Sequence, residues 1–233
     1  MQQAGVAAIC FDLFTLFDPR TVVAAAERQL PGHGSRLCQV WQTRQFQYSW
    51  LRVAAGQYRD FEAVTAEALE FALRDQRLEL SSQARRQLVG TYSALELWPD
   101  AREHLAMWRR AGLKLAPLAN FAPWMIERLL GRVGLIDSFD ALISTDAART
   151  FKPAPQAYAL GPARFGLRRD QIVFSAFGGW DAVGAKWFGF RSFWVNRLGV
   201  TAETLGAVPD GSGPSFAELA SFVDGLGVAA EAG

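Results

Sequence analysis

The sequence predicts an α/β protein with a parallel-sheet core and a helical cap inserted after the first strand. Short runs rich in Val, Ile, Leu and Phe recur along the chain, as in parallel strands that are covered on both faces. Strand-like and helical segments alternate from about residue 99 to the end, which is typical of a doubly wound core. Between residues 20 and 98 the periodicity is helical and no strand-like run occurs.

The strands and helices of the predicted core follow from short apolar runs and their flanks. Strands are predicted over residues 6–11, 113–120, 139–144, 171–177 and 192–196. A helix is predicted over residues 123–133, because Pro123 suits a first helical turn and apolar side chains follow at helical spacing. The last residues, 227–233, are interpreted as a frayed tail.

Residues 20–98 are predicted to form the cap, which leaves residues 1–19 and 99–233 for the core. An N-cap residue is expected at Asp60. The helical stripe that follows it consists of Phe61, Val64, Ala68 and Phe71. The alternative is an ordinary crossover of two or three helices packed on the sheet. The length of this block favours a cap, because a crossover needs far fewer residues.

Composition excludes several classes of function. The chain has 233 residues and a formal net charge of +1, so bulk charge indicates neither a nucleic-acid partner nor an anionic membrane. No run approaches the roughly 18 apolar residues of a membrane helix, and Asp12 interrupts the apolar start where a signal peptide would be continuous. Cys10 and Cys38 are too few for a disulfide framework. We therefore expect a cytoplasmic protein with a small-molecule substrate or ligand.

Polar residues stand where the predicted strands end, which is where doubly wound folds form their sites. Asp12 and Thr15 follow the first strand, Asn120 the second, Lys152 the third and Asp181 the fourth. A carboxylate beside a lysine can act as a nucleophile that the cation keeps ionised. Taken singly, Asp12 and Asp181 could cap helices and Lys152 could be a solvated loop residue. Their occurrence at successive strand ends favours a shared site.

Five segments in order resemble the (S)-2-haloacid dehalogenases of the haloacid dehalogenase (HAD) superfamily. They are CFDLFTLFD, VWQTRQFQYSWLR, LANFAPWM, FDALISTDAARTFKPAPQAYAL and WDAVGAKWFGFRSFWVNR. The resemblance covers most of residues 6–197 and includes the cap helix that separates this family from the phosphatases of the superfamily. It implies a Rossmann-like core with a helical cap, a reaction without a metal or other cofactor, and often a homodimer.

The resemblance also implies roles for individual residues. In that family an aspartate displaces halide from C2 of a short 2-halo acid by backside attack, and water then hydrolyses the enzyme ester. The matching nucleophile is Asp12, the threonine of the same motif is Thr15, and the lysine that keeps the nucleophile ionised is Lys152. Tyr158 and Asp181 match the tyrosine and the acid that orient the lysine and the water.

The positions that would bind substrate depart from the family. The first motif is one residue shorter between Asp12 and Thr15. The arginine expected after Trp41 is replaced by Gln42, and Arg44 is no simple substitute because two residues along a helix rotate a side chain by roughly 200°. The family's LSN reads LAN, and its SSN before the last acid reads AFG. The substrate-side residues that result are Ala119, Asn120, Phe121, Ala176, Phe177 and Gly178.

These departures predict weakened or altered turnover of small halo acids. One missing preorganised donor costs about 2.7–4 kcal/mol, or roughly 10²- to 10³-fold in rate. Gln42 and Gly178 remove two donors from the departing halide. Phe14, Phe121 and Phe177 add aromatic surface, which predicts either a filled pocket or space for a larger, flatter apolar ligand.

Two other functions stay open at the level of sequence. A catalytically silent or repurposed relative could bind a larger apolar ligand or a cofactor such as haem, with His33 as the candidate axial ligand. A magnesium phosphatase is the second. Such enzymes place another aspartate two residues after the nucleophile and pair acids in the last motif, whereas this chain has Phe14 and a solitary Asp181 there.

Overall fold

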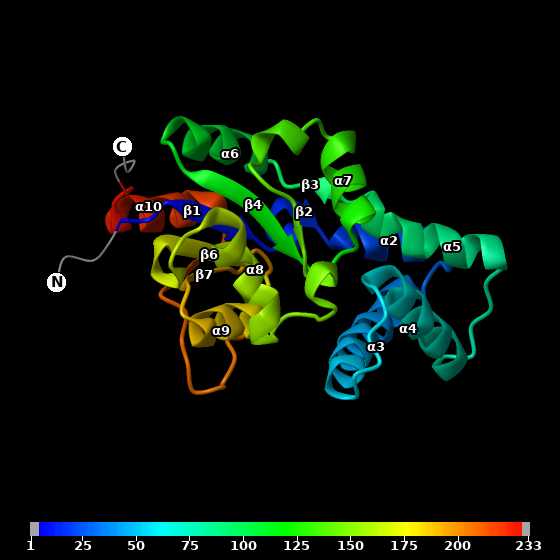
Figure 1. The fold of residues 1–233 in the computed structure, drawn as a ribbon. Coiled ribbons are helices and arrows are strands. Elements are labelled where there is room, and N and C mark those ends of the chain that lie inside the picture. The colour runs from blue at the N-terminus through cyan, green and yellow to red at the C-terminus, as the bar shows by residue number, and fades with distance from the viewer. Residues whose placement is uncertain (1–4, 230–233) are drawn as a thin grey trace.

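A computed structural model describes residues 5–229, with a six-stranded sheet at its centre (Figure 1). The strand order is β5-β4-β1-β6-β7-β8, and every neighbouring pair is parallel. The strands are β1 (Ala8–Phe11), β4 (Lys114–Ala119), β5 (Ile143–Ser144), β6 (Ile172–Ala176), β7 (Arg191–Val195) and β8 (Gly211–Gly213). Because β1 lies between β4 and β6, the carboxyl ends of these three strands are neighbours, where such folds place their sites.

Helices cover both faces of the sheet, as the apolar composition of its strands requires. One face packs against α6 (Ala101–Arg110), α7 (Pro123–Arg132) and α10 (Phe216–Leu226), the other against α8 (Pro155–Phe165) and α9 (Gly179–Phe188). Side chains of β1 alternate between the two layers: Ile9 and Phe11 join the first, Ala8 and Cys10 the second. Short 3₁₀ turns are η1 (Thr91–Ser93), η2 (Ile136–Ser138), η3 (Thr145–Ala148) and η4 (Arg169–Gln171).

A block of helices follows the first strand and its short helix α1 (Leu13–Leu16). The block consists of α2 (Arg20–Gln29), α3 (Gly34–Ala54), α4 (Phe61–Asp75) and α5 (Ser82–Gly90). In Figure 1 the pair α3 and α4 lies beside the sheet rather than across one of its faces. A two-residue antiparallel ribbon, β2 (Phe17–Asp18) with β3 (Glu96–Leu97), joins the two ends of the block.

The predicted α4 begins as expected. The Asp60 side chain accepts a hydrogen bond from the backbone nitrogen of Ala63 at 2.8 Å, as an N-cap does. Phe61, Val64 and Ala68 are buried, whereas Phe71 is only half-buried. The division of the chain into a core of residues 1–19 and 99–233 and a cap of residues 20–98 stays a prediction. The ribbon spans the predicted boundaries, with β2 on the core side of the first and β3 on the cap side of the second.

Some elements differ from the sequence-based prediction for identifiable reasons. The third predicted strand, 139–144, shrinks to β5 because Asp140 takes over part of the pairing: its backbone nitrogen donates to the oxygen of Leu115, and its carboxylate accepts from the nitrogen of Leu115. The edge strand β8 has the sequence Gly-Ser-Gly and so lacks any apolar signal. Of the tail predicted to fray, residues 227–229 are instead hydrogen-bonded to Val6, and residues 230–233 lie outside the described range.

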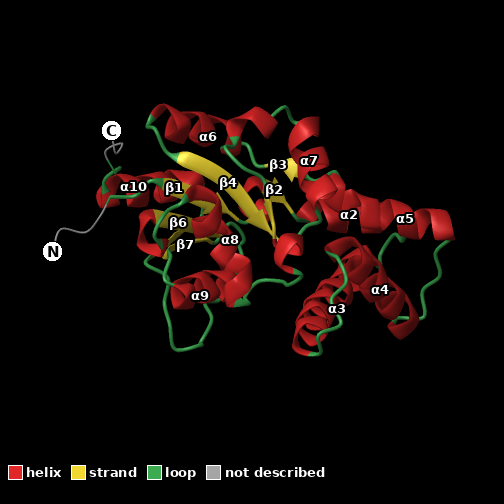
Figure 2. Cartoon of the chain, viewed as in Figure 1, coloured by secondary structure: helices red, strands yellow, loops and turns green. Residues whose placement is uncertain are grey.

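The fold class predicted from the sequence, a Rossmann-like parallel sheet with a helical insertion after the first strand, is confirmed. Figure 2 shows the strands grouped in the core, with helices making up the insertion apart from the ribbon at its base. Within residues 5–229, none of the helices combines the length and the apolar character needed to cross a bilayer.

Candidate active site

Asp12 stands at the carboxyl end of β1, in the turn that opens α1. Its backbone nitrogen continues the sheet by donating to the oxygen of Ser175 at 2.9 Å. One carboxylate oxygen caps α1 by accepting from the nitrogen of Phe14 at 2.7 Å. The other faces the amine of Lys152. Both oxygens of the Asp12 carboxylate are thus held in fixed directions.

Lys152 bridges two carboxylates in the interior. Its Nζ lies 2.6 Å from Oδ2 of Asp12 and 2.7 Å from Oδ2 of Asp181, and the lysine side chain is 1% exposed. Burial alone would lower the pKa of Lys152, but the charges of Asp12 and Asp181 outweigh it and raise the pKa above the usual value. The lysine is therefore a cation at neutral pH, and it compensates carboxylates that could not be buried alone.

Asp181 and Tyr158 complete the cluster behind Asp12. The Tyr158 hydroxyl donates to Oδ1 of Asp181 at 2.6 Å. Burial raises the pKa of the Asp181 carboxyl to about 6, against the opposing effect of Lys152. Burial also raises the pKa of Tyr158 well above its usual value, and the charge of Asp181 adds to this. Tyr158 therefore stays a neutral donor. No larger residue fits at Gly184, where a Cβ would lie 2.6 Å from the tyrosine oxygen.

The side chains of Thr15 and Asn120 bind backbone atoms of Asp12 and Lys152 and not the Asp12 carboxylate. The hydroxyl of Thr15 donates to the backbone oxygen of Asp12 at 2.7 Å, so it stabilises the turn without reaching the Asp12 carboxylate. The side-chain oxygen of Asn120 accepts from the backbone nitrogen of Lys152 at 2.8 Å and from the hydroxyl of Thr145 at 3.3 Å. Its oxygen being occupied, Asn120 is left with its amide nitrogen to offer to a ligand.

The turn after Asp12 is braced from elsewhere in the chain. The indole nitrogen of Trp98 donates to the oxygen of Phe14 at 3.0 Å. The guanidinium of Arg197 donates twice to the oxygen of Thr15, at 3.0 and 2.9 Å, and stacks on Trp98. Since α1 has only four residues, its last carbonyls have no hydrogen-bond donors within the helix. Trp98 and Arg197 donate to them instead.

Asp12 opens onto a cavity of about 210 Å³ between the helical block and the core. Rings make up much of its wall, with amide groups and one guanidinium among them. The lining residues are Asp12, Phe14, Pro19, Arg20, Val23, Gln42, Gln45, Phe46, Phe61, Tyr92, Asn120, Phe121, Phe177, Gly178, Trp180 and Leu198.

Most residues predicted to bind substrate line this cavity. Gln42, Asn120, Phe121, Phe177 and Gly178 do so, whereas Ala119 and Ala176 are buried and do not. Thr15, Lys152, Tyr158 and Asp181 do not line it either, and the last three form the cluster behind Asp12.

Arg44 turns away from the cavity, as helical geometry predicts. Its guanidinium stacks on the ring of Phe71, 3.7 Å from the ring centroid. Arg20, which the sequence did not single out, is the one cation among the described residues that line the cavity. Its Nε and Nη2 are paired with Asp18, and its side chain is 62% exposed.

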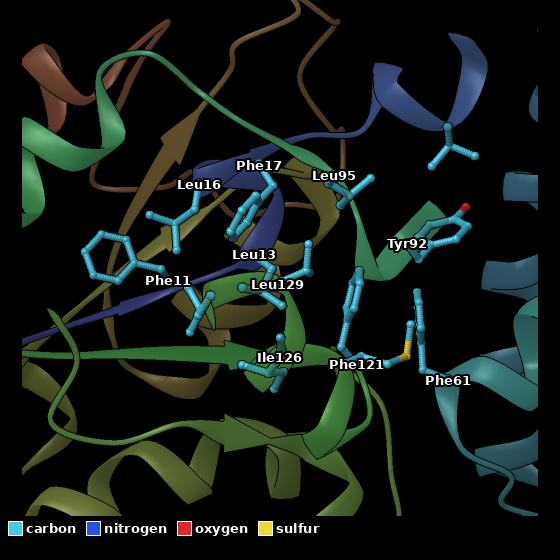
Figure 3. Packing of buried hydrophobic residues seen from close by; sticks show 14 of the residues in the cluster. Phe11, Leu13, Leu16, Phe17, Phe61, Tyr92, Leu95, Phe121, Ile126 and Leu129 are labelled. Atoms are coloured by element: carbon cyan, nitrogen blue, oxygen red, sulfur yellow. The ribbon is translucent and has the colours of Figure 1, made fainter. Parts of the chain in front are cut away.

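The phenylalanines that replace polar residues pack on one another. The ring of Phe14 contacts those of Phe121 and Phe177, with centroids 5.5 and 5.8 Å apart. Phe121 also stacks on Phe61 of α4, with centroids 4.3 Å apart. Figure 3 shows these two rings face to face beside Tyr92. Because the cavity persists next to these rings, they line its wall and do not fill it.

The residues around Asp12 do not fit a Mg²⁺ site. Both carboxylates that a cation would need are bound to Lys152, and Phe14 offers no oxygen. Within the described part of the chain, no group of three or more His, Cys, Asp or Glu side chains is arranged to hold a metal. His33 lies in the exposed turn before α3 and is not among the residues that line the cavity, so it does not fit an axial haem ligand there.

Sequence analysis missed several residues that the structure brings to the site. Gln45 and Phe46 follow the predicted Gln42 at helical spacing on α3, and this stripe is a signal that could have been found. The braces Trp98 and Arg197 carry no such signal, because each acts on a segment far away in the sequence.

Comparison with known proteins gives a consistent result. The family profile described as hydrolase, haloacid dehalogenase-like hydrolase, matches residues 6–189. The (S)-2-haloacid dehalogenase of Xanthobacter autotrophicus is 43% identical over 194 residues, which is 83% of this chain and 76% of that protein. Haloacetate dehalogenase H-2 of Moraxella sp. (strain B) is 38% identical over 206 residues, 88% of this chain and 92% of that protein.

Solved structures agree with these relatives. The crystal structure of the L-2-haloacid dehalogenase RSc1362 superposes with a TM-score of 0.92 at 39% identity, covering 94% of this chain and 99% of that one. The L-2-haloacid dehalogenase of Xanthobacter autotrophicus with chloropropionic acid covalently bound gives a TM-score of 0.87 at 38% identity, covering 95% and 99%.

Proposed function

The chain belongs to the L-2-haloacid dehalogenase family of the HAD superfamily, and we propose that it hydrolyses the carbon–halogen bond of a 2-halo acid with Asp12 as the nucleophile. The observation that carries this proposal is the position of Asp12. Its carboxylate lies at the wall of the cavity, while Lys152 holds it from behind at 2.6 Å. A relative with chloropropionic acid covalently bound supports a covalent route.

The first step is a displacement at C2 of the substrate. An oxygen of Asp12 forms a bond to C2, the carbon–halogen bond breaks, and the halide leaves with the electron pair. The amine of Lys152 donates to one oxygen of the Asp12 carboxylate, and the nitrogen of Phe14 donates to the other and fixes its direction. An ester between Asp12 and the substrate results.

The second step hydrolyses this ester. Water attacks the carboxyl carbon of Asp12, and the bond from that carbon to the substrate oxygen breaks. One proton of the water ends on the departing oxygen, which becomes the hydroxyl of a 2-hydroxy acid, and the other is released. We assign to Asp181 the removal of the first proton from the attacking water and its transfer to the departing oxygen, because a pKa of about 6 suits a base near neutral pH. Tyr158 and Lys152 hold that carboxylate in place.

The groups opposite Asp12 support a weaker reaction on short halo acids. The donors that line the cavity near the replaced family positions are the neutral amides Gln42 and Asn120, and a neutral donor stabilises a departing anion less than a guanidinium does. Arg20 supplies positive charge, but it is already paired with Asp18. We propose that Arg20 and Asn120 face the substrate carboxylate, and that turnover of 2-chloropropionate is slow.

Cofactor, assembly and location follow as further parts of this proposal. The position next to both carboxylates is taken by Lys152, so the reaction proceeds without a metal there. Cys10 and Cys38 are free, buried thiols, which agrees with a reducing cytoplasm. A homodimer is proposed from the family, and light scattering of the purified protein tests it.

An aromatic wall also favours a second candidate, a catalytically silent relative that only binds an apolar ligand. Halide release from (S)-2-chloropropionate separates the two. The proposal expects release that Asp12→Asn abolishes and that Asp170→Asn, at a carboxylate paired with Arg168 on the surface, leaves unchanged. A single turnover in H₂¹⁸O is expected to place ¹⁸O in Asp12 and not in the first product. Halide release that is absent, or that persists in Asp12→Asn, contradicts the proposal.

A further inference from the structure

The wall of the cavity beside Asp12 is largely aromatic, beginning with Phe14, two residues after Asp12. Phe14 donates its backbone hydrogen to Asp12 and turns its ring against Phe121 and Phe177. The insertion contributes Phe61, which stacks on Phe121, and Phe46, whose ring meets Trp180 edge to face at 5.4 Å. A group attached to the carbon that Asp12 attacks is therefore surrounded by ring faces and edges.

The size of the cavity indicates what this wall can enclose. A cavity of roughly 150 Å³ lined by apolar side chains is enough to hold benzene, and the cavity at Asp12 is about 210 Å³. The remaining volume is about that of two waters, each of which takes roughly 30 Å³ in the liquid. A methyl group on C2 would leave most of this apolar space to water, whereas a ring would fill it and leave room for the halogen and the carboxylate.

The polar and apolar groups of the cavity wall are separated in a way that suits a substrate with a ring on one side and a carboxylate on the other. Asn120 and Gln42 offer amides, and Arg20 offers a guanidinium. The rings offer no hydrogen-bond acceptor for water, except at Tyr92, whose buried hydroxyl has no hydrogen-bond partner among the described residues. Offset and edge-to-face contacts with a flat ring are the arrangements that aromatic walls favour.

We propose that the substrate is a 2-halo acid whose C2 carries an aromatic ring, directly or through one methylene, and that the wall of Phe14, Phe61, Phe121 and Phe177 selects it. This inference rests on the proposed function, since it names the substrate class of the same site. A single extra methylene in a matching apolar pocket is worth about 10- to 200-fold in kcat/KM. A whole ring is therefore expected to raise kcat/KM at least 10-fold over a methyl group.

Halide release from 2-chloro-3-phenylpropionate and from 2-chloropropionate tests the proposal. The expected result is a kcat/KM at least 10-fold higher for the phenyl compound. Val23→Phe, which adds a ring inside the cavity, is expected to remove this preference. Val208→Phe makes the same change at a site that is 78% exposed and is expected to keep it. An equal or lower kcat/KM for the phenyl compound overturns the inference, and so does an unchanged preference in folded Val23→Phe.

Binding to the Asp12→Asn variant separates this inference from the proposed function. Calorimetry is expected to give a Kd for 2-chloro-3-phenylpropionate at least 10-fold below that for 2-chloropropionate, whether or not the wild-type protein turns either compound over. Tight binding without halide release would support the aromatic site and overturn the hydrolase. Halide release from 2-chloropropionate, with equal affinities for both compounds, would support the hydrolase and overturn the aromatic site.

Discussion

The indole nitrogen of Trp50 donates a hydrogen bond to the backbone oxygen of Lys152, at 3.2 Å. Trp50 belongs to α3, whereas Lys152 carries the amine that binds Asp12. A side chain of the helical block therefore holds the segment that positions the buried lysine. Tyr58, which follows α3, adds a second contact with the same segment, because its hydroxyl donates to Asp146 at 2.6 Å.

Trp50→Phe is expected to lower kcat while KM changes little, since Trp50 is not among the residues that line the cavity. Loss of one hydrogen bond of about 0.5–1.5 kcal/mol corresponds to roughly a 2- to 10-fold decrease. Trp187→Phe is the matched control, because Trp187 is 59% exposed on α9. Steady-state kinetics checks this, and a change confined to KM, or an equal loss in the control, contradicts it.

Lys152→Met is expected to destabilise the protein strongly. Removing the amine leaves Asp12 and Asp181 without the cation that both now bind, and removing one partner of a buried pair costs about 3–5 kcal/mol. Lys186→Met removes a surface pair with Asp210, in which the lysine side chain is 40% exposed, and such pairs contribute about 0–1 kcal/mol. Urea unfolding compares the two variants, and equal losses would contradict the structural assignment.

The activity is expected to rise with pH through about 6, the pKa to which burial raises Asp181. Only the ionised carboxylate can take a proton from water, so kcat/KM should increase across this range and then level off. Asp181→Asn is expected to abolish this rise of kcat/KM with pH together with most of the activity. Asp170→Asn is expected to keep both. A pH profile measured between pH 4 and 9 on one substrate decides, and a flat profile in the wild-type protein counts against Asp181 as the base.

The same pKa affects stability with a definite sign. A carboxyl whose pKa is higher in the folded protein binds more protons folded than unfolded between the two values, so its contribution to the free energy of unfolding falls as pH rises. For Asp181 this window runs from about 3.8 to about 6. The contribution of Lys152 to the free energy of unfolding also falls as pH rises. It is fully present below pH about 10.5 and is lost as pH rises through the raised pKa of Lys152.

Gln42→Arg is expected to accelerate the turnover of 2-chloropropionate. A guanidinium in the cavity restores a charged donor for the departing halide, and one such donor is worth roughly 10²- to 10³-fold. Gln39→Arg introduces the same side chain at an exposed position of α3 and is expected to have no such effect. Initial rates of halide release provide the measurement, and an unchanged rate in Gln42→Arg argues that the donors already present suffice.

The sequence predicted that Asp12, Lys152 and Asp181 lie together, because the topology brings the ends of parallel strands together. Asp12, Lys152 and Asp181 are separated by long stretches of chain, yet each follows an apolar run that becomes a parallel strand. Tyr158 came from the family resemblance, and its contact with Asp181 is present. The orientation of Arg44 followed from helical geometry alone.

The remaining features depend on tertiary contacts that no local pattern encodes. The ribbon of β2 and β3 is too short to show a period. The presence of Arg20 at the cavity depends on how α2 leaves that ribbon, and the bond from Trp50 to Lys152 depends on how α3 lies against the core. Whether the phenylalanines filled the pocket or lined it was a question of packing, and only coordinates could answer it.

The brace formed by Trp98 and Arg197 holds the turn after Asp12, which the sequence predicts to be one residue shorter than in the family. Its carbonyls are anchored by side chains that belong to remote parts of the polypeptide, so the conformation of the turn depends on residues far away in the sequence. Lengthening this turn by one residue, with Trp98 and Arg197 unchanged, should misdirect the Asp12 carboxylate. Such a variant is expected to lose activity although Asp12, Lys152 and Asp181 are all retained.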